Sequence, residues 1–208
     1  PSTLQRLAWR DFDRSGKEDS FCTRQFSGPL PSSLTHLTCD LFLSDLELPE
    51  LLPPKLEHLD VNYCRLLDDT LPPLPATLKH LACANCNLTK LPDLPPSLLH
   101  LDFTGNRSIS PFPALPAQLK HLNCSEARLD ALPTLPLKLE YLNCSCNCNL
   151  PSLPDLPDSL TYLDCEDTSM ATLPTLPAGL VHLNCNMNKL KALPDPLPQN
   201  LRALHCQI

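Results

Sequence analysis

One pattern recurs about every twenty residues from Leu34 to the C-terminal end, and this period restricts the fold more than any other feature. Its clearest copy, Leu180 to Pro194, reads L-x-x-L-x-C-x-x-N-x-L-x-x-L-P. A fixed period of this length indicates a solenoid, in which each repeat is one structural unit stacked on the next. The copies begin at Leu34, Leu56, Leu78, Leu98, Leu119, Leu139, Leu160, Leu180 and Leu201.

The apolar spacing within a repeat predicts a short strand. Leu183 and Cys185 alternate with His182 and Asn184, so one pair faces the interior and the other faces solvent. The other leucines of the copy complete the core of that coil. This is the pattern of a leucine-rich repeat of the α/β class. We expect a right-handed β-solenoid, or horseshoe, with a parallel concave sheet and about nine to ten repeats of 20–22 residues.

Proline predicts the structure of the opposite, convex side. The chain has 25 prolines, and many stand in Leu-Pro-x-Leu-Pro connectors such as 91–95, 132–136 and 173–177. Proline fixes φ, restricts the preceding residue and removes a backbone donor. We therefore expect an extended, polyproline-like convex side with very little helix.

The first thirty residues depart from the pattern. We interpret 1–30 as a degenerate, cap-like first repeat, with a strand near Leu4, Leu7 and Trp9 and a polar insert after it; the repeat domain is then 31–208. The insert resembles half of a calcium loop from Asp11, but Cys22 stands where a ligating glutamate belongs, which favours a solvated loop. The chain lacks an initial methionine and stops partway through a repeat, so we expect a segment of a longer protein.

The chain has twelve cysteines, and most of them occupy one slot of the repeat. Val61, Phe103 and Trp9 fill this slot in other repeats, which indicates packing and favours free thiols in a reducing compartment. Cys83 and Cys86 form a C-x-x-C, but both fall on inward slots. The cysteines of the slot are Cys39, Cys83, Cys124, Cys144, Cys165, Cys185 and Cys206.

The asparagine that follows the strand in many such repeats is present in only some copies here. We therefore expect some turns to satisfy their backbone groups by other means. The run from Cys144 to Leu150 also has one residue too many, which predicts a local bulge. Successive occupants of the asparagine slot are Phe42, Cys64, Cys86, Asn106, Ala127, Asn147, Thr168 and Asn188.

The outward strand positions form two rows across the predicted sheet. The first row reads His36, His58, His80, His100, His121, Tyr141, Tyr162, His182 and Ala203. The second reads Thr38, Asp60, Ala82, Asp102, Asn123, Asn143, Asp164, Asn184 and His205. The predicted partner-binding residues are His58, Asp60, His80, His100, Asp102, His121, Asn123, Tyr141, Asn143, Tyr162, Asp164, His182 and Asn184.

Three interpretations of the first row remain open. The rings stack on one another and hydrogen-bond the Asp/Asn row to stabilise the sheet, or they form a recognition strip, and both can hold together. The third is metal binding by adjacent histidines, which a flat row does not favour because the ligands must converge. If the row binds a partner, we expect the affinity to change near pH 6, where six imidazoles would gain charge together.

The remaining composition narrows the classes of function. The net charge of -7 argues against a nucleic-acid partner, since phosphates demand clustered Lys and Arg. No apolar run approaches the roughly 20 residues that span a bilayer, so we expect no membrane insertion. We find no nucleophile–base pair, phosphate loop or paired carboxylates, and therefore predict no catalytic residues, no cofactor and no resident metal.

The repeat with its Leu-Pro-x-Leu-Pro connectors at 91–95, 132–136, 153–157 and 173–177 resembles the leucine-rich repeats of the YopM and IpaH/SspH group of bacterial effectors. The resemblance implies an effector that type III secretion delivers into the host cytoplasm, where the concave face binds host proteins. The cysteine slot departs from that group and resembles the cysteine ladder of some internalins.

These observations favour a non-enzymatic protein–protein interaction module. One alternative is the substrate-recognition part of an IpaH-like E3 ubiquitin ligase, whose catalytic domain would follow Ile208. A second alternative is an extracellular adhesin at the bacterial surface, which would require oxidised cysteines. The identity of the partner and the oligomeric state do not follow from the repeat pattern.

Overall fold

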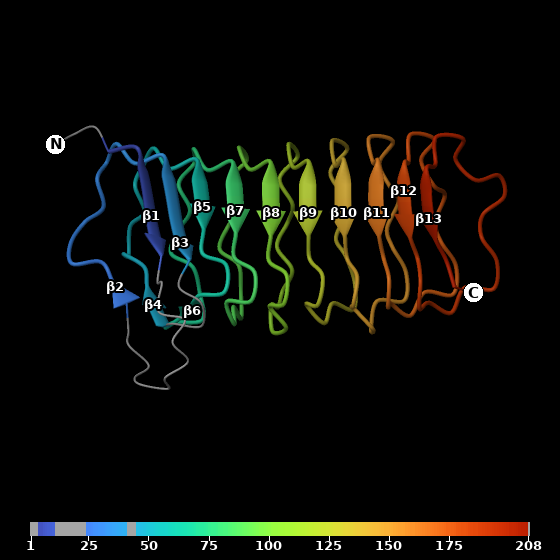
Figure 1. Cartoon of the computed structure of the whole chain (residues 1–208), viewed down its shortest axis with the longest axis horizontal. Helices are drawn as coiled ribbons and strands as arrows, with labels where there is room; N and C mark the ends of the chain where they lie inside the picture. The colour runs from blue at the N-terminus through green and yellow to red at the C-terminus, as the bar shows by residue number, and fades with distance from the viewer. Residues whose placement is uncertain (1–3, 11–23, 41–44, 208) are drawn as a thin grey trace.

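The computed structural model describes residues 4–10, 24–40 and 45–207, and over these residues the chain forms a solenoid of parallel strands without helix (Figure 1). The principal sheet has ten strands in chain order. This confirms the expected parallel-sheet solenoid with very little helix. The strands are β1 (Arg6–Arg10), β3 (His36–Asp40), β5 (His58–Asp60), β7 (His80–Ala82), β8 (His100–Asp102), β9 (His121–Asn123), β10 (Tyr141–Asn143), β11 (Tyr162–Asp164), β12 (His182–Asn184) and β13 (Ala203–His205).

The strands pair so that equivalent positions of successive repeats lie side by side. His58 pairs with His80 and Leu59 with Leu81, and the same register continues along the sheet. Strand β1 pairs with β3 in the same way, which places Trp9 beside Cys39 as its slot predicts. The calcium-like loop and Phe42 lie outside the described residues.

A second, three-stranded parallel sheet lies at the N-terminal end of the solenoid (Figure 1). Its strands are β2 (Arg24–Gln25), β4 (Asp45–Glu47) and β6 (Arg65–Leu66). The repeat pattern does not predict this second sheet. Strands β4 and β6 fall in the two 22-residue repeats, whose extra length gives room for a second extended segment. Leu46 in β4 and Leu66 in β6 are buried in the core.

Proline also closes a turn just before each principal strand. In every repeat from Leu34 onward, a proline carbonyl accepts the N–H of the repeat's first leucine, three residues later, at 3.0–3.1 Å. Pro177 and Leu180 form one such turn. The connectors themselves carry no regular structure after Leu71, in agreement with the expected extended convex side.

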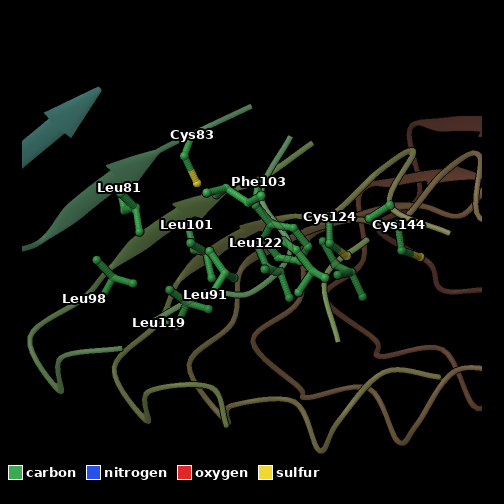
Figure 2. Close-up of a cluster of buried hydrophobic side chains, with 14 of the residues drawn as sticks. Leu81, Cys83, Leu91, Leu98, Leu101, Phe103, Leu119, Leu122, Cys124 and Cys144 are labelled. Carbon is green, nitrogen blue, oxygen red and sulfur yellow. The ribbon is translucent and has the colours of Figure 1, made fainter. Parts of the chain in front are cut away.

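The core is a continuous column of leucines and thiols beneath the principal sheet (Figure 2). Leu81, Leu101 and Leu122 are fully buried, as are the leucines that begin their repeats. Each buried leucine contributes about 2 kcal/mol. Phe103 is the largest fully buried side chain, and its ring meets that of Phe112 edge-on with centroids 5.5 Å apart.

The asparagines of the broken ladder each connect two repeats. Asn147 is fully buried, and its Nδ2 donates to the carbonyls of Cys124 and Cys144 at 3.0 and 2.8 Å. Its Oδ1 accepts from the N–H groups of Ala127 and Leu129, at 3.1 and 2.9 Å. Those two donors belong to the preceding repeat, whose own slot holds alanine. One asparagine therefore satisfies the turns of two coils.

In slots without asparagine, the thiols of Cys64 and Cys86 and the hydroxyl of Thr168 donate to some of the backbone carbonyls. Cys64 Sγ donates to the Cys39 carbonyl at 3.3 Å, and Cys86 Sγ donates to the Val61 carbonyl at 3.0 Å. Both bonds reach the preceding repeat, as the asparagine amide does. The turns whose own slot lacks asparagine are thus satisfied partly by these thiols and partly by the asparagine of the next repeat, as at Cys86 and Ala127.

The extra residue between Cys144 and Leu150 produces a local turn. The N–H of Leu150 donates to the Asn147 carbonyl at 2.9 Å, and the turn returns Leu150 to the core. This confirms the predicted irregularity. Cys146 and Cys148, which flank Asn147, are both exposed.

In the repeats of β5 and β7 to β12, the fourth residue after the central leucine of the strand adopts left-handed backbone. It is occupied mainly by residues for which positive φ is uncommon. At Gly105, a Cβ atom would overlap Asn85 Oδ1 of the preceding repeat, so glycine is needed there for space as well as for φ. The residues are Tyr63, Asn85, Gly105, Glu126, Cys146, Asp167 and Met187.

Candidate binding surface

The solvent-facing side of the principal sheet carries the thirteen predicted partner-binding residues. The structure brings them into two adjacent rows, in the register the repeat predicts. We call the first row the ring ladder; it consists of His36, His58, His80, His100, His121, Tyr141, Tyr162 and His182. All but His182 are half-buried, because each ring lies between the rings of its neighbours.

The rings of the ladder stack face to face along most of its length. From His58 to Tyr162 the ring centroids are 3.9–4.3 Å apart and the interplanar angles are 8–15°. The ends are looser, at 5.4 Å and 22° for His36–His58 and 5.7 Å and 38° for Tyr162–His182. The spacing follows from the roughly 4.8 Å separation of neighbouring strands. The predicted stacking is confirmed.

Stacking keeps the central imidazoles neutral. Burial, together with repulsion from the rings of His100, His58 and His121, lowers the pKa of His80 to about 3. Burial and His121 likewise lower the pKa of His100 to about 4, although Asp102 opposes the shift. Burial also lowers the pKa values of His58 and His121.

These pKa values overturn one expectation. Six imidazoles do not gain charge together near pH 6, because four rings of the ladder lose hydration in the stack and repel one another when protonated. The central strip therefore presents uncharged ring edges at neutral pH. Burial and the neighbouring Tyr162 also raise the pKa of Tyr141 to about 12, so this hydroxyl is protonated.

The Asp/Asn row closes the turn that follows each strand. Asp102 Oδ1 accepts the N–H of Thr104 at 3.0 Å, and Asn143 Oδ1 accepts that of Ser145 at 3.0 Å. Short polar side chains commonly make this bond to the backbone two residues ahead. The same bond forms from Asp60, Asn123, Asp164 and Asn184.

On the other side of the ladder, ion pairs connect neighbouring repeats. Lys79 Nζ lies 2.9 Å from Glu57 Oε2, and Lys120 Nζ lies 2.7 Å from Glu140 Oε1. Both pairs are about half exposed, so each contributes little stability. The paired charges therefore cancel on this side of the ladder. The opposite side, formed by the Asp/Asn row, carries the carboxylates of Asp60, Asp102 and Asp164.

The structure gives no support to the metal-binding interpretation. Among the residues described, no group of three or more His, Cys, Asp or Glu side chains is arranged to hold a metal ion. The parallel stack explains this, because neighbouring imidazoles lie face to face and their nitrogens do not converge.

The cysteines of the inward slot behave as core residues. Cys64 is buried in the core. Seven further buried thiols are those of Cys39, Cys83, Cys86, Cys124, Cys144, Cys165 and Cys185. Burial raises their pKa values, to about 12 for Cys39 and Cys86. The two thiols of the C-x-x-C donate to different carbonyls, those of Asp102 and Val61, at 3.4 and 3.0 Å.

Thiol labelling measures this partition directly. In the folded protein we expect a disulfide reagent such as DTNB to modify Cys146 and Cys148 quickly, and the buried thiols only after unfolding in urea. Replacing both exposed residues with serine should remove two equivalents from the fast phase. An unchanged fast phase in that double variant would contradict the burial pattern.

No family model matches the chain, and no curated protein sequence matches it. Among solved structures, the chain is similar to YopM from Yersinia enterocolitica, with a TM-score of 0.67 and 35% identity over 86% of this chain and 44% of YopM. The chain thus spans less than half of that YopM chain.

Two further structures align with the chain. A leucine-rich repeat protein from Leptospira interrogans has a TM-score of 0.50 and 21% identity over 84% of this chain and 59% of its own, and shares the fold. YopM from Yersinia pestis, described as a leucine-rich effector protein, has a TM-score of 0.48 and 28% identity over 85% of this chain and 72% of its own. Among the described residues, no helix is long and apolar enough to cross a membrane.

The repeat length, the ten-stranded parallel sheet and the likeness to YopM agree with one another. The chain is a leucine-rich repeat protein that resembles YopM, a bacterial member of this fold.

Proposed function

We propose that the chain is a non-enzymatic protein-binding module and that the ring ladder, with the Asp/Asn row beside it, is its binding strip. The observation that supports this most is the exposed edge of the ladder. The six rings from His58 to Tyr162 stack into one continuous edge, in which burial lowers the pKa values of the imidazoles, and carboxylates and amides border it. Aromatic side chains with a polar rim are the usual composition of protein-binding surfaces.

The likeness to YopM extends the proposal to an effector that acts in the cytosol of a host cell on host proteins. The free thiols of the core support this, because a reducing compartment keeps such thiols unpaired. Partners of the acidic chain would be proteins with neutral or basic surfaces, since the net charge is -7.

A matched pair of variants tests the proposal in host-cell lysate and then with the purified partner. The first replaces His80, His100 and His121 with alanine and so opens the centre of the ladder. The second replaces the exposed convex residues Asp93, Thr134 and Asp155 with alanine. Circular dichroism must show that both variants are folded.

We expect the ladder variant to bind the purified partner about tenfold or more weakly, since central aromatic residues dominate interface energy. The convex variant should bind as the parent does. Equal affinity of parent and ladder variant would refute the binding strip and move the interface to another face.

A further inference from the structure

An open apolar groove lies between the two connectors that lead into β9 and β10. Its volume is about 660 Å³, and its walls come from residues 114–118 and 133–138. Pockets for small ligands span roughly 300–1,000 Å³. Leucine, alanine and proline make up most of the lining, and no residue of the ring ladder contributes to it. The groove is therefore a surface separate from the proposed binding strip.

Leu137 forms an unusually apolar wall of this groove. Its side chain is 85% exposed, the largest value among the large hydrophobic residues that the structure describes. The equivalent position holds Ala117 in the preceding repeat and Asp158 in the next. Leu137 thus places apolar surface in solvent, where the described part of the chain does not cover it.

The polar side of the groove also differs from the equivalent place in other repeats. In the repeat of β7, Thr77 Oγ1 donates to two carbonyls of the preceding connector, at 3.1 and 2.8 Å. Ser97 and Ser159 make the same pair of bonds in the repeats of β8 and β11. Lys138 occupies this position in the repeat of β10, and its Nζ donates to Gln118 Oε1 at 2.7 Å instead.

The groove consequently has a backbone acceptor and a cation available to a ligand. Ala117 lies in the lining, and its carbonyl accepts no hydrogen bond from a described residue. Lys138 is the one charged residue among the described residues of the lining. No described carboxylate forms an ion pair with it. A matching ligand would combine an apolar group with a carboxylate.

We propose that this groove binds the C-terminal residue of a partner polypeptide when that residue is apolar, with its side chain against Leu137 and its terminal carboxylate paired with Lys138. In a C-terminal residue, the apolar side chain and the carboxylate leave the same Cα, so both can reach neighbouring residues of one turn. Capture of a C-terminal carboxylate is a recurring mode of peptide recognition.

Two other carboxylates fit the groove less well. An internal acidic residue carries its carboxylate on its own side chain, and the adjacent apolar side chain of an extended segment points to the opposite side. A fatty acid joins a carboxylate to an apolar chain, but it has no N–H group. The unpaired Ala117 carbonyl favours a ligand that also carries an N–H donor.

N-acetyl-glycyl-alanyl-leucine with a free carboxylate is the probe, and its C-terminal amide removes only the charge. Titration into ¹⁵N-labelled protein should give saturable shifts of the Ala117, Leu137 and Lys138 amide signals. We expect the amide to bind about fivefold more weakly, as for the loss of one exposed charge pair. Octanoate and N-acetyl-glutamyl-leucine amide represent the two other carboxylates, and both should bind more weakly than the free peptide.

Two pairs of variants locate the site. Lys138→Met keeps the stem of the side chain and should weaken the free peptide about fivefold without changing the affinity of the amide. Lys191→Met, at an exposed lysine outside the groove, should change neither affinity. Leu137→Ser should weaken both peptides, and Leu51→Ser, at another highly exposed leucine, should weaken neither. All four residues are exposed, so the variants should fold.

Equal affinity of the free peptide and its amide, or a difference between them that persists in Lys138→Met, would overturn the proposal. Absence of saturable shifts would do the same, as would equal binding of octanoate or of the glutamyl peptide. The ladder variant keeps every residue of the groove, and the convex variant keeps Leu137 and Lys138. The result for the binding strip therefore does not decide the result for the groove.

Discussion

Acidification from pH 7 to pH 4 should destabilise the solenoid by about 3 kcal/mol through His80 and His100 of the ring ladder, after allowance for partial solvent exposure of the rings. In the unfolded chain, histidines bind protons with a pKa near 6.5. In the folded chain, burial and neighbouring imidazoles lower the pKa values of His80 and His100 to about 3 and about 4.

The sign follows from proton uptake. Below about pH 6.5 the unfolded state binds protons that the stacked rings do not accept, so the free energy of unfolding falls as the pH falls. The stabilisation is complete above pH 6.5 and is lost progressively toward the folded pKa values of 3–4. Asp102 and Asp60, which face the central rings, reduce the effect but do not reverse it.

Urea unfolding at pH 7, 5.5 and 4, followed by circular dichroism, measures this loss. Acid also protonates carboxylates, so the informative quantity is a difference between variants. The double variant His80→Phe/His100→Phe keeps two planar rings without a titrating group and should lose about 3 kcal/mol less than the parent between pH 7 and pH 4. His205→Phe, an exposed position outside the ladder, is the control and should follow the parent. Parallel losses in parent and double variant would contradict a neutral stack.

The repeat predicts the fold well because its physics is local. The alternation of Leu183 and Cys185 with polar neighbours defines the strand, and a proline three residues before each first leucine closes its turn. Because the register is parallel and the period nearly constant, equivalent residues must lie side by side. Both outward rows could therefore be assigned from the sequence.

Other features depend on contacts that the sequence does not encode locally. The left-handed position is occupied by Tyr63, Glu126 and Met187, which have no preference for positive φ, so only Asn85, Gly105 and Asp167 indicate it. The repeat pattern does not specify which acceptor the Asn184 amide binds; in the structure its Nδ2 donates to Glu166 Oε2. The pKa values of the imidazoles depend on burial and on the separation of the rings, and neither can be obtained from the order of residues in the row.

Asn147→Ala should lower the free energy of unfolding by about 4 kcal/mol, more than an average buried polar substitution. The side chain is fully buried and makes five backbone hydrogen bonds. Its Nδ2 donates to the carbonyls of Cys124, Cys144 and Ser145, and its Oδ1 accepts from two N–H groups of the preceding turn. Alanine leaves these donors and acceptors in a space from which water is excluded. The loss falls on two coils, because the slot of the preceding repeat holds Ala127.

Two comparison variants separate the contributions. Asn147→Cys can restore a donor to the Cys124 carbonyl, as Cys86 does to Val61, but it provides no good acceptor for the Ala127 and Leu129 N–H groups. We expect it to recover about 1 kcal/mol of the loss. Cys148→Ala, an exposed change one residue away, should alter the stability by less than about 0.5 kcal/mol.

Urea denaturation of the three variants gives the free energies, and amide hydrogen exchange gives their location. In Asn147→Ala, the N–H groups of Ala127 and Leu129 should exchange faster than in the parent, although both lie one repeat before the substitution. Faster exchange confined to residues 144–150 would show that each asparagine serves its own turn alone. Acceleration in both turns would show that the alternation of asparagine with Cys86, Ala127 and Thr168 is a shared network in which one side chain satisfies two repeats.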